Sequence, residues 1–334
     1  LCLVGSEMCI RDRAEETCDG LDNDCDGATD EGLSGGVLTV PTTCGLGECS
    51  GSTGFLTCVE ENLVNDTCDP LAGASLEICD GLDNDCDGES DDACGAFQME
   101  AGSVAVGGAH VTVPLVNTYF EPIVVATVQY ANNTQPVITR VSNVTATSFD
   151  LRLQNPSGVA PEVDNVSYWV VERGVWMVDG VKLEADRYLS TRVDRKGAWL
   201  WGEPRTYGQV YAQPVVLGQV MSENDPRWSV FFAQGANHFD PPDASTLKTG
   251  RHIGEDTAHA RANETIGYIV VEAVHTNLAG VEFEAAQGLD TVLGVQNGPP
   301  FSYNFNNPFV TAPTVVVASS AGMDGGDGGW AQIH

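Results

Sequence analysis

Along the chain, the hydrophobic pattern separates an N-terminal part with few large apolar residues from a longer part dominated by strand-like runs. After Cys94, Val, Thr, Tyr and Phe prevail, Pro and Gly punctuate the runs, and long helical periodicity is absent. Residues 149–154 alternate apolar and polar positions, which is typical of a half-buried strand. Continuous β-branched runs at residues 123–126, 215–217 and 315–317 suit strands packed between layers. The pattern predicts a mainly β protein.

The β-branched runs are copies of one another. Each run follows a proline, namely Pro122, Pro214 and Pro313. Residues 168–172 (YWVVE) match residues 268–272 (YIVVE), and each segment is followed by a Glu-Ala pair at the same distance, Glu184-Ala185 and Glu284-Ala285. The repeat period is about 85 to 100 residues, the size of a small β-sandwich. We therefore expect tandem antiparallel β-sandwich repeats, of which the last is truncated.

A second repeat lies near the N-terminus, where the segment CDGLDNDCDG occurs at residues 18–27 and again at residues 79–88. In the first copy, three aspartates alternate before a glycine, which matches positions 1, 3, 5 and 6 of a calcium-binding loop. An EF-hand would need a bidentate Glu at position 12, where Leu33 and Cys94 stand. We therefore expect a shorter loop, closed by Asp30 in one copy and by Asp91 in the other.

We predict that both loops bind Ca²⁺, because alternate carboxylates in a tight loop converge and supply the hard oxygen donors that Ca²⁺ prefers. The predicted ligands are Asp19, Asp22, Asp24, Asp26 and Asp30 in the first loop and Asp80, Asp83, Asp85, Asp87 and Asp91 in the second. An acidic turn that binds nothing is the alternative, but carboxylates this close repel one another unless a cation neutralises them. Thiolate ligation of copper or zinc is the rival chemistry.

Nine cysteines lie between residues 18 and 94, and residues 95–334 contain none. Such a density predicts a disulfide framework formed in an oxidising compartment. We expect Cys18–Cys25 and Cys79–Cys86 to close small rings within the loops. The cysteines between the loops, Cys44, Cys49, Cys58 and Cys68, allow three pairings that the sequence does not rank, and Cys94 is left over.

The charge of the chain is strongly negative, at −32, and residues 14–94 hold 21 Asp and Glu without any Lys or Arg. Such a field repels nucleic acid and anionic membranes and attracts divalent cations. No nucleophile elbow, phosphate-binding loop or catalytic triad pattern occurs, so we do not expect an enzyme. The polar residues between His252 and Glu264 are interpreted as a loop, and residues 324–329 as a turn rather than a third cation loop.

The two acidic segments resemble the metal-binding repeat of MopE-type proteins, which are secreted or surface proteins of bacteria named after a copper-binding member. The β units resemble H-type lectin-like sandwiches, through residues 120–125, 141–149 and 166–170. This second resemblance implies six-stranded antiparallel sandwiches, assembly in threes and sugar binding. Because Trp169 becomes Ile269 in the next unit, we do not expect Trp169 to be an essential aromatic platform.

Residues 1–13 look like a translated sequencing adapter, and we set them aside. The expected organisation is an acidic metal-binding module at residues 14–94, followed by β-sandwich repeats at residues 95–182, 183–282 and 283–334. We expect an extracellular or cell-surface bacterial protein that binds divalent cations and, through its sandwiches, glycans or surface polymers, with no nucleic-acid partner and no membrane insertion. The alternatives are a copper-acquisition protein and the non-catalytic part of a truncated secreted hydrolase.

Overall fold

The fold is almost entirely β, with 44% of the described residues in strands and 1% in helix. The computed structural model describes residues 15–23, 27–32, 36–60, 62–75, 82–90, 95–198, 201–288, 302, 304–305, 307–323 and 328–333. The chain divides into two compact units, residues 1–93 and residues 94–334. The prediction of a mainly β chain with antiparallel sheets and a disulfide-rich N-terminal part is confirmed. Among the described residues, no helix has the length and hydropathy needed to span a membrane.

The N-terminal unit is built on a small antiparallel sheet. Its strands are β1 (Thr39–Cys44), β2 (Ser52–Val59) and β3 (Asn62–Val64), in the order β1-β2-β3, with the 3-10 helix η1 (Gly47–Cys49) between the first two. The buried apolar side chains among its described residues are Leu38 and the three cysteines Cys49, Cys58 and Cys86. A core of this size contributes little stability, so covalent links must hold the unit.

Three disulfides cross-link this unit: Cys18–Cys58, Cys44–Cys68 and Cys49–Cys86. The predicted ring pairs Cys18–Cys25 and Cys79–Cys86 are therefore wrong. Each acidic loop is tied to the sheet or to η1 instead of to itself, with partners 40 and 37 residues apart. In the chain-entropy model, closing these longer loops restricts the unfolded chain more than closing a seven-residue ring. Cys25, Cys79 and Cys94 lie outside the described residues.

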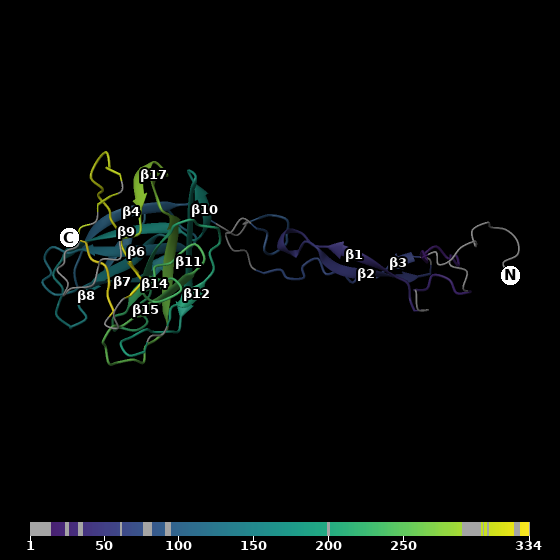
Figure 1. The fold of residues 1–334 in the computed structure, drawn as a ribbon, viewed down its shortest axis with the longest axis horizontal. Coiled ribbons are helices and arrows are strands. Elements are labelled where there is room, and N and C mark those ends of the chain that lie inside the picture. The colour runs from purple at the N-terminus through teal and green to yellow at the C-terminus, as the bar shows by residue number, and fades with distance from the viewer. Residues whose placement is uncertain are drawn as a thin grey trace. The chain divides into compact units, whose positions relative to one another are not determined.

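The C-terminal unit begins with a six-stranded sandwich, which we call the first sandwich. One sheet holds β4 (Met99–Val106), β9 (Asp164–Glu172) and β6 (Pro122–Gln129), and the other holds β5 (Val111–Pro114), β8 (Ser148–Gln154) and β7 (Ile138–Thr145), each in that order (Figure 1). Strand β8 alternates as its sequence predicts, with Phe149, Leu151 and Leu153 buried. Strand β6 is buried along nearly its whole length, as its β-branched run predicts.

A second sandwich follows and repeats the strand order of the first. One sheet holds β10 (Gly174–Val178), β11 (Val181–Ser190), β16 (Glu264–Glu272) and β13 (Pro214–Val220), and the other holds β12 (Glu203–Arg205), β15 (Leu247–His252), β14 (Val230–Gln234) and β19 (Ser320–Ala321). Strands β11 to β16 thus correspond in order to strands β4 to β9. All of these pairs are antiparallel except β14–β19.

A hairpin with the same pairing register follows strand β9 of the first sandwich and strand β16 of the second. Strand β10 pairs with β11 so that Gly174 lies opposite Ala185. Strand β17 (Val274–Leu278) pairs with β18 (Val281–Ala285) so that Val274 lies opposite Ala285. Because residues 94–334 form one compact unit, the boundaries predicted at residues 182 and 282 stay a prediction.

Carboxylates at equivalent positions hold the loops of both sandwiches. The carboxylate of Glu172 accepts the N–H groups of Phe120 and Glu121, at 2.7 and 2.6 Å, just before Pro122. In the second sandwich, Glu272 accepts the N–H groups of the two residues before Pro214, at 2.9 and 2.6 Å. These repeated acids therefore fix the entry into the proline-led strands β6 and β13.

A second pair of acids does the same at the other end of these strands. Asp164 accepts the N–H groups of residues 131–133, and Glu264 accepts those of Asn224 and Asp225. Both carboxylates are at most 2% exposed. Since an unpaired buried N–H costs about 1–3 kcal/mol, each carboxylate replaces hydrogen bonds that the loop would otherwise lose. The recurrence of these acids in the sequence is thus structural.

One buried acid makes a pH dependence testable. Glu184 is 4% exposed and accepts the N–H of Gly208, and burial raises its pKa from 4.5 to about 7. Between these two values the folded chain holds the proton more tightly than the unfolded chain, so the free energy of unfolding falls as the pH rises. Glu184→Gln keeps the shape of the side chain but cannot ionise, so its free energy of unfolding should not fall over this pH range. At pH 8 the variant should therefore be more stable than the unmodified chain by on the order of 3 kcal/mol.

Denaturant unfolding of both proteins at pH 4, 6 and 8 measures this difference. The exposed Glu162→Gln serves as the control and should track the unmodified chain at every pH. Parallel stability curves for the unmodified chain and Glu184→Gln would show that the buried carboxyl does not carry the pH dependence.

Candidate metal site

The second acidic loop gathers three carboxylates. Ligand oxygens of Asp83, Asp85 and Asp87 all lie within 4.8 Å of one another. Asp83 is buried, Asp85 is half-buried and Asp87 is exposed. The group therefore has one side anchored in the unit and one side open to solvent, from which an ion could enter.

The loop takes this shape because its backbone wraps around Asp83, the first of the three clustered aspartates. The carboxylate of Asp83 accepts the N–H groups of Asp87 and Gly88, at 3.1 and 3.0 Å. Cys86 and Gly88 have φ of 66° and 99°, in the left-handed region that favours glycine. This turn carries the chain around Asp83, so the alternate aspartates face the same point.

The rest of the unit supports the loop from one side. The carbonyl of Asp83 accepts the N–H of Glu48 in η1 at 3.0 Å, and the Cys49–Cys86 disulfide joins η1 to the loop. A Cβ added to Gly47 would lie 2.3 Å from the Asp83 carbonyl oxygen, so only glycine fits there. The disulfide that replaces the predicted loop ring thus anchors the loop to η1.

The first loop repeats the closing contact of the second. Gly27, with φ of 97°, donates its N–H to the carboxylate of Asp22 at 3.0 Å, as Gly88 does to Asp83. The counterparts of Asp85 and Asp87 are Asp24 and Asp26, which lie outside the described residues. At this contact, identical sequence therefore gives the same local geometry.

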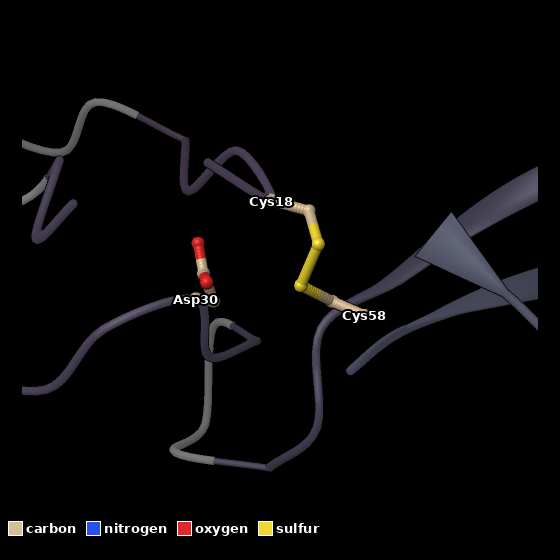
Figure 2. A group of neighbouring side chains, drawn as sticks. All are labelled: Cys18, Asp30 and Cys58. Carbon is tan, nitrogen blue, oxygen red and sulfur yellow. A yellow bond between two sulfur atoms is a disulfide. The ribbon is translucent and has the colours of Figure 1, made fainter. Parts of the chain in front are cut away.

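Asp30, predicted as the closing metal ligand of the first loop, is bonded to the backbone of that loop, and its role as a ligand stays a prediction. Its carboxylate accepts the N–H groups of Asp19 and Gly20, at 2.9 and 3.0 Å. Figure 2 shows this carboxylate beside the Cys18–Cys58 disulfide. The two sulfur atoms are bonded to each other, so they are not thiolate ligands, and Cys18, Cys58 and Asp30 do not form a soft-metal site.

The remaining predicted ligands are placed as follows. Asp19 accepts the N–H of Leu21 and the hydroxyl of Thr17, at 3.0 and 3.2 Å. Asp80 and Asp91 lie outside the described residues. The structure thus brings together Asp83, Asp85 and Asp87, while the assignment of all ten aspartates as ligands stays a prediction. The role of Gly47 was not predicted, and only the Gly-Glu-Cys sequence that forms η1 could have pointed to it.

The polar residues between His252 and Glu264 do not converge on one site. His252 is buried, which lowers its pKa to about 4, and its Nε2 lies 2.8 Å from the Gly329 carbonyl. Glu255 pairs with Lys196, and Asp256 with Arg261. Because each group has its own partner, these contacts favour the interpretation as a polar loop. The turn predicted at residues 324–329 is described only at Gly328 and Gly329.

The comparison with protein families agrees with this geometry. The model of the copper-binding MopE family, described as "Putative metal-binding motif", matches residues 9–31 and 73–92. Both acidic loops match a metal-binding motif. The two MopE-type matches contain all ten predicted aspartate ligands. Neither the curated proteins nor the solved structures contain a significant match, and no comparison supports the lectin-like resemblance.

The left-handed glycine of the MopE-type loop provides a test of this geometry. Gly88→Ala places a Cβ at φ of 99°, which costs about 1–2 kcal/mol. If the strained loop splays its carboxylates, the affinity for a divalent cation should fall by about tenfold. Calorimetric titration of the full chain with Ca²⁺ measures this loss.

Gly73→Ala is the matched control, because Gly73 also has φ of 99° and no heavy atom within 4 Å of an added Cβ, but lies outside both CDGLDNDCDG repeats, residues 18–27 and 79–88. It should cost similar stability and leave cation affinity unchanged. Equal losses of affinity in the two variants would show that general destabilisation, rather than loop shape, is responsible.

Proposed function

We propose that the two acidic loops bind Ca²⁺ and that the bound ions stiffen the N-terminal unit of an extracellular binding protein. The observation that carries this proposal is the convergence of Asp83, Asp85 and Asp87 within 4.8 Å, in a loop that matches a metal-binding motif.

Electrostatics favours an ion at this point. Two carboxylates 4.8 Å apart repel by about 3 kcal/mol at an effective dielectric constant near 20. Residues 14–94 contain no Lys or Arg that could offset this repulsion. A divalent cation would convert the mutual repulsion into attraction, so its binding should tighten the loop and the unit around it.

The donor set favours calcium over copper. Residues 14–94 contain no His and no Met, which are common ligands of copper. The six described cysteines, Cys18, Cys44, Cys49, Cys58, Cys68 and Cys86, are all in disulfides. Carboxylate and carbonyl oxygens remain, and these hard donors suit Ca²⁺. Copper acquisition is the alternative, because the matching family model carries a copper-binding name.

Titration of the full chain with Ca²⁺, and separately with Cu²⁺ and Mg²⁺, decides between these functions. We expect two Ca²⁺ sites, both abolished in Asp24→Ala/Asp85→Ala, because each substitution removes a central ligand of one loop. Glu60→Gln removes an exposed charge outside the loops and should bind as the unmodified chain does. Tight copper binding that excess Ca²⁺ does not displace would instead establish metal acquisition.

The location that we propose is the cell exterior, since a framework of disulfides persists in oxidising compartments. We propose no catalytic role for the protein. That it forms the non-catalytic part of a secreted hydrolase stays a hypothesis.

Contact with glycans is a second candidate function, proposed for the sandwiches. Trp201 is 44% exposed, its ring lies edge-on to His238, and the ammonium of Lys248 lies 4.5 Å from the ring centroid. Phe239 is 51% exposed beside His238. An exposed aromatic surface with polar neighbours can pack against the C–H face of a sugar while the polar groups hydrogen-bond its hydroxyls.

Binding of the full chain to a panel of immobilised glycans tests this proposal. Trp201→Ala should lower the signal on any bound glycan by about tenfold, the loss expected from one aromatic contact of about 1.4 kcal/mol. Leu189→Ala removes another exposed apolar side chain and should not change it. Absence of binding by the unmodified chain, or equal binding by both variants, would contradict a glycan site at Trp201.

A further inference from the structure

The described residues between 302 and 333, here called the third segment, pair with strands of both sandwiches. This segment carries Pro313 and the run after it, which is the third copy of the proline-led strands β6 and β13. In Figure 1 it is the yellow chain near β6, β7 and β14. We call each region of contact between two repeats a seam. The third segment forms one seam with each sandwich, and the two sandwiches form a third seam with each other.

In the seam between the first and second sandwiches, the end of β13 and the loop after it meet β7. Gln219, five residues after Pro214, donates to the carbonyl of Thr139 in β7 at 3.2 Å. The next residue of β7, Arg140, is fully buried and donates to the carbonyls of Asp225 and Arg227, at 3.0 and 2.8 Å. A buried guanidinium needs such acceptors, so the contact is specific.

In the seam between the second sandwich and the third segment, the partner is β14, the counterpart of β7. Ser320, seven residues after Pro313, pairs in parallel with Phe232 of β14. Ser319 exchanges hydrogen bonds with the backbone of Gly218 in β13, at 3.0 and 3.2 Å. The end of the proline-led run of the third segment thus meets β14 through backbone pairing, whereas the end of β13 meets β7 through side-chain hydrogen bonds.

In the seam between the third segment and the first sandwich, the same relation recurs. Gln129, seven residues after Pro122, forms a parallel bridge with Ile333. The carbonyl of Ile333 accepts the N–H of Tyr130 at 2.6 Å, and its N–H donates to Val128 at 3.0 Å. Trp330 donates from its indole to the carbonyl of Val137 at 2.9 Å.

Ile333 belongs to the copy of β14 in the third segment. Trp330 lies three residues before Ile333, as Trp228 lies three residues before Phe231 of β14. The rings of Trp228 and Trp330 are themselves in contact, with centroids 5.8 Å apart. Equivalent residues of successive repeats therefore occupy related positions in the structure.

The order of the three seams is cyclic. In two seams, the end of a proline-led strand contacts the β7-type segment of the preceding repeat. In the remaining seam, the end of the first proline-led strand, β6, contacts the β7-type segment of the last repeat. Equivalent positions also touch near the middle: Thr127 and Ala318, each five residues after its proline, are joined by hydrogen bonds of 3.1 and 2.9 Å. Head-to-tail contacts of one kind form a closed ring when the rotation between units closes, and otherwise an open filament.

We infer that the three repeats close a ring within one chain, with the third segment completing the seams. The buried apolar residues agree, because one continuous cluster contains Val124 of β6, Val215 and Met221 of the second sandwich, and Val317 packs against it. In this ring, each head-to-tail contact is formed between repeats of the same chain. The protein should therefore be monomeric, and a change in the third segment should loosen the first sandwich.

A cross-link tests the closure in the full chain. Gln129→Cys/Ile333→Cys places two thiols at a bridged pair, and residues 95–334 contain no native cysteine. Under oxidation the pair should form a disulfide within one chain, identified by mass spectrometry of the peptides and by migration as a monomer. Gln129→Cys/Val310→Cys, whose second position is 90% exposed, should form none. Cross-links between two copies only, or no 129–333 link, would overturn the inference.

Hydrogen exchange provides a second measurement that requires no cross-link. The Tyr130 amide donates to the carbonyl of Ile333, which lies three residues after Trp330. Trp330→Ala should therefore loosen this acceptor and speed hydrogen exchange of the Tyr130 amide by about tenfold or more. Trp201→Ala, which removes a tryptophan outside the seams, should leave that amide unchanged. Unaltered protection in Trp330→Ala, or a trimeric mass of the unmodified chain by sedimentation, would show that the repeats do not close on themselves.

Discussion

Carboxylates that accept backbone N–H groups shape both units of this protein. In the acidic loop, Asp83 accepts two N–H groups and fixes the turn that gathers the other aspartates. In the sandwiches, Glu172 and Glu272 accept two each and fix the entry into the central strands. A charged acceptor makes a stronger hydrogen bond than a neutral one, so one acid can order a whole turn. Many of the negative charges of the chain are therefore structural, and the net charge alone does not identify a binding site.

The loops differ from the sandwiches in what surrounds the acids. Among the acids of the second sandwich, Glu264 lies 3.9 Å from the guanidinium of Arg140, and Asp225 and Asp256 lie within 4.0 Å of that of Arg261, so built-in cations balance these acids. Residues 14–94 contain no basic side chain, and their loops place several carboxylates around one point. The same residue type thus stabilises a fold where cations are built in, and favours an external cation where they are not. This contrast supports cation binding by the N-terminal unit.

Ring closure explains how the repeats form one compact unit. A proline-led strand end that is left exposed presents unpaired backbone groups, which invite pairing with another copy. Here the ends of β6 and of the third copy pair with Ile333 and Phe232 of neighbouring repeats. The hydrogen bonds differ between seams, since Gln219 bonds to Thr139 in one and Ser319 to Gly218 in another. Distinct seams favour one order of packing over the others.

The local features followed from the residues themselves. Alternation at Phe149–Gln154 predicted β8, β-branched runs predicted β6 and β13, and the Asp-x-Asp-x-Asp-Gly spacing predicted the cluster at Asp83, because strand pleat and turn geometry depend on neighbours in the chain. The pairing of Cys18 with Cys58 and of Cys86 with Cys49 was mispredicted, and the seam formed by Ile333 was not foreseen. These contacts join residues that the sequence separates by tens to hundreds of positions, so only the folded arrangement of sheets and repeats decides which of them meet.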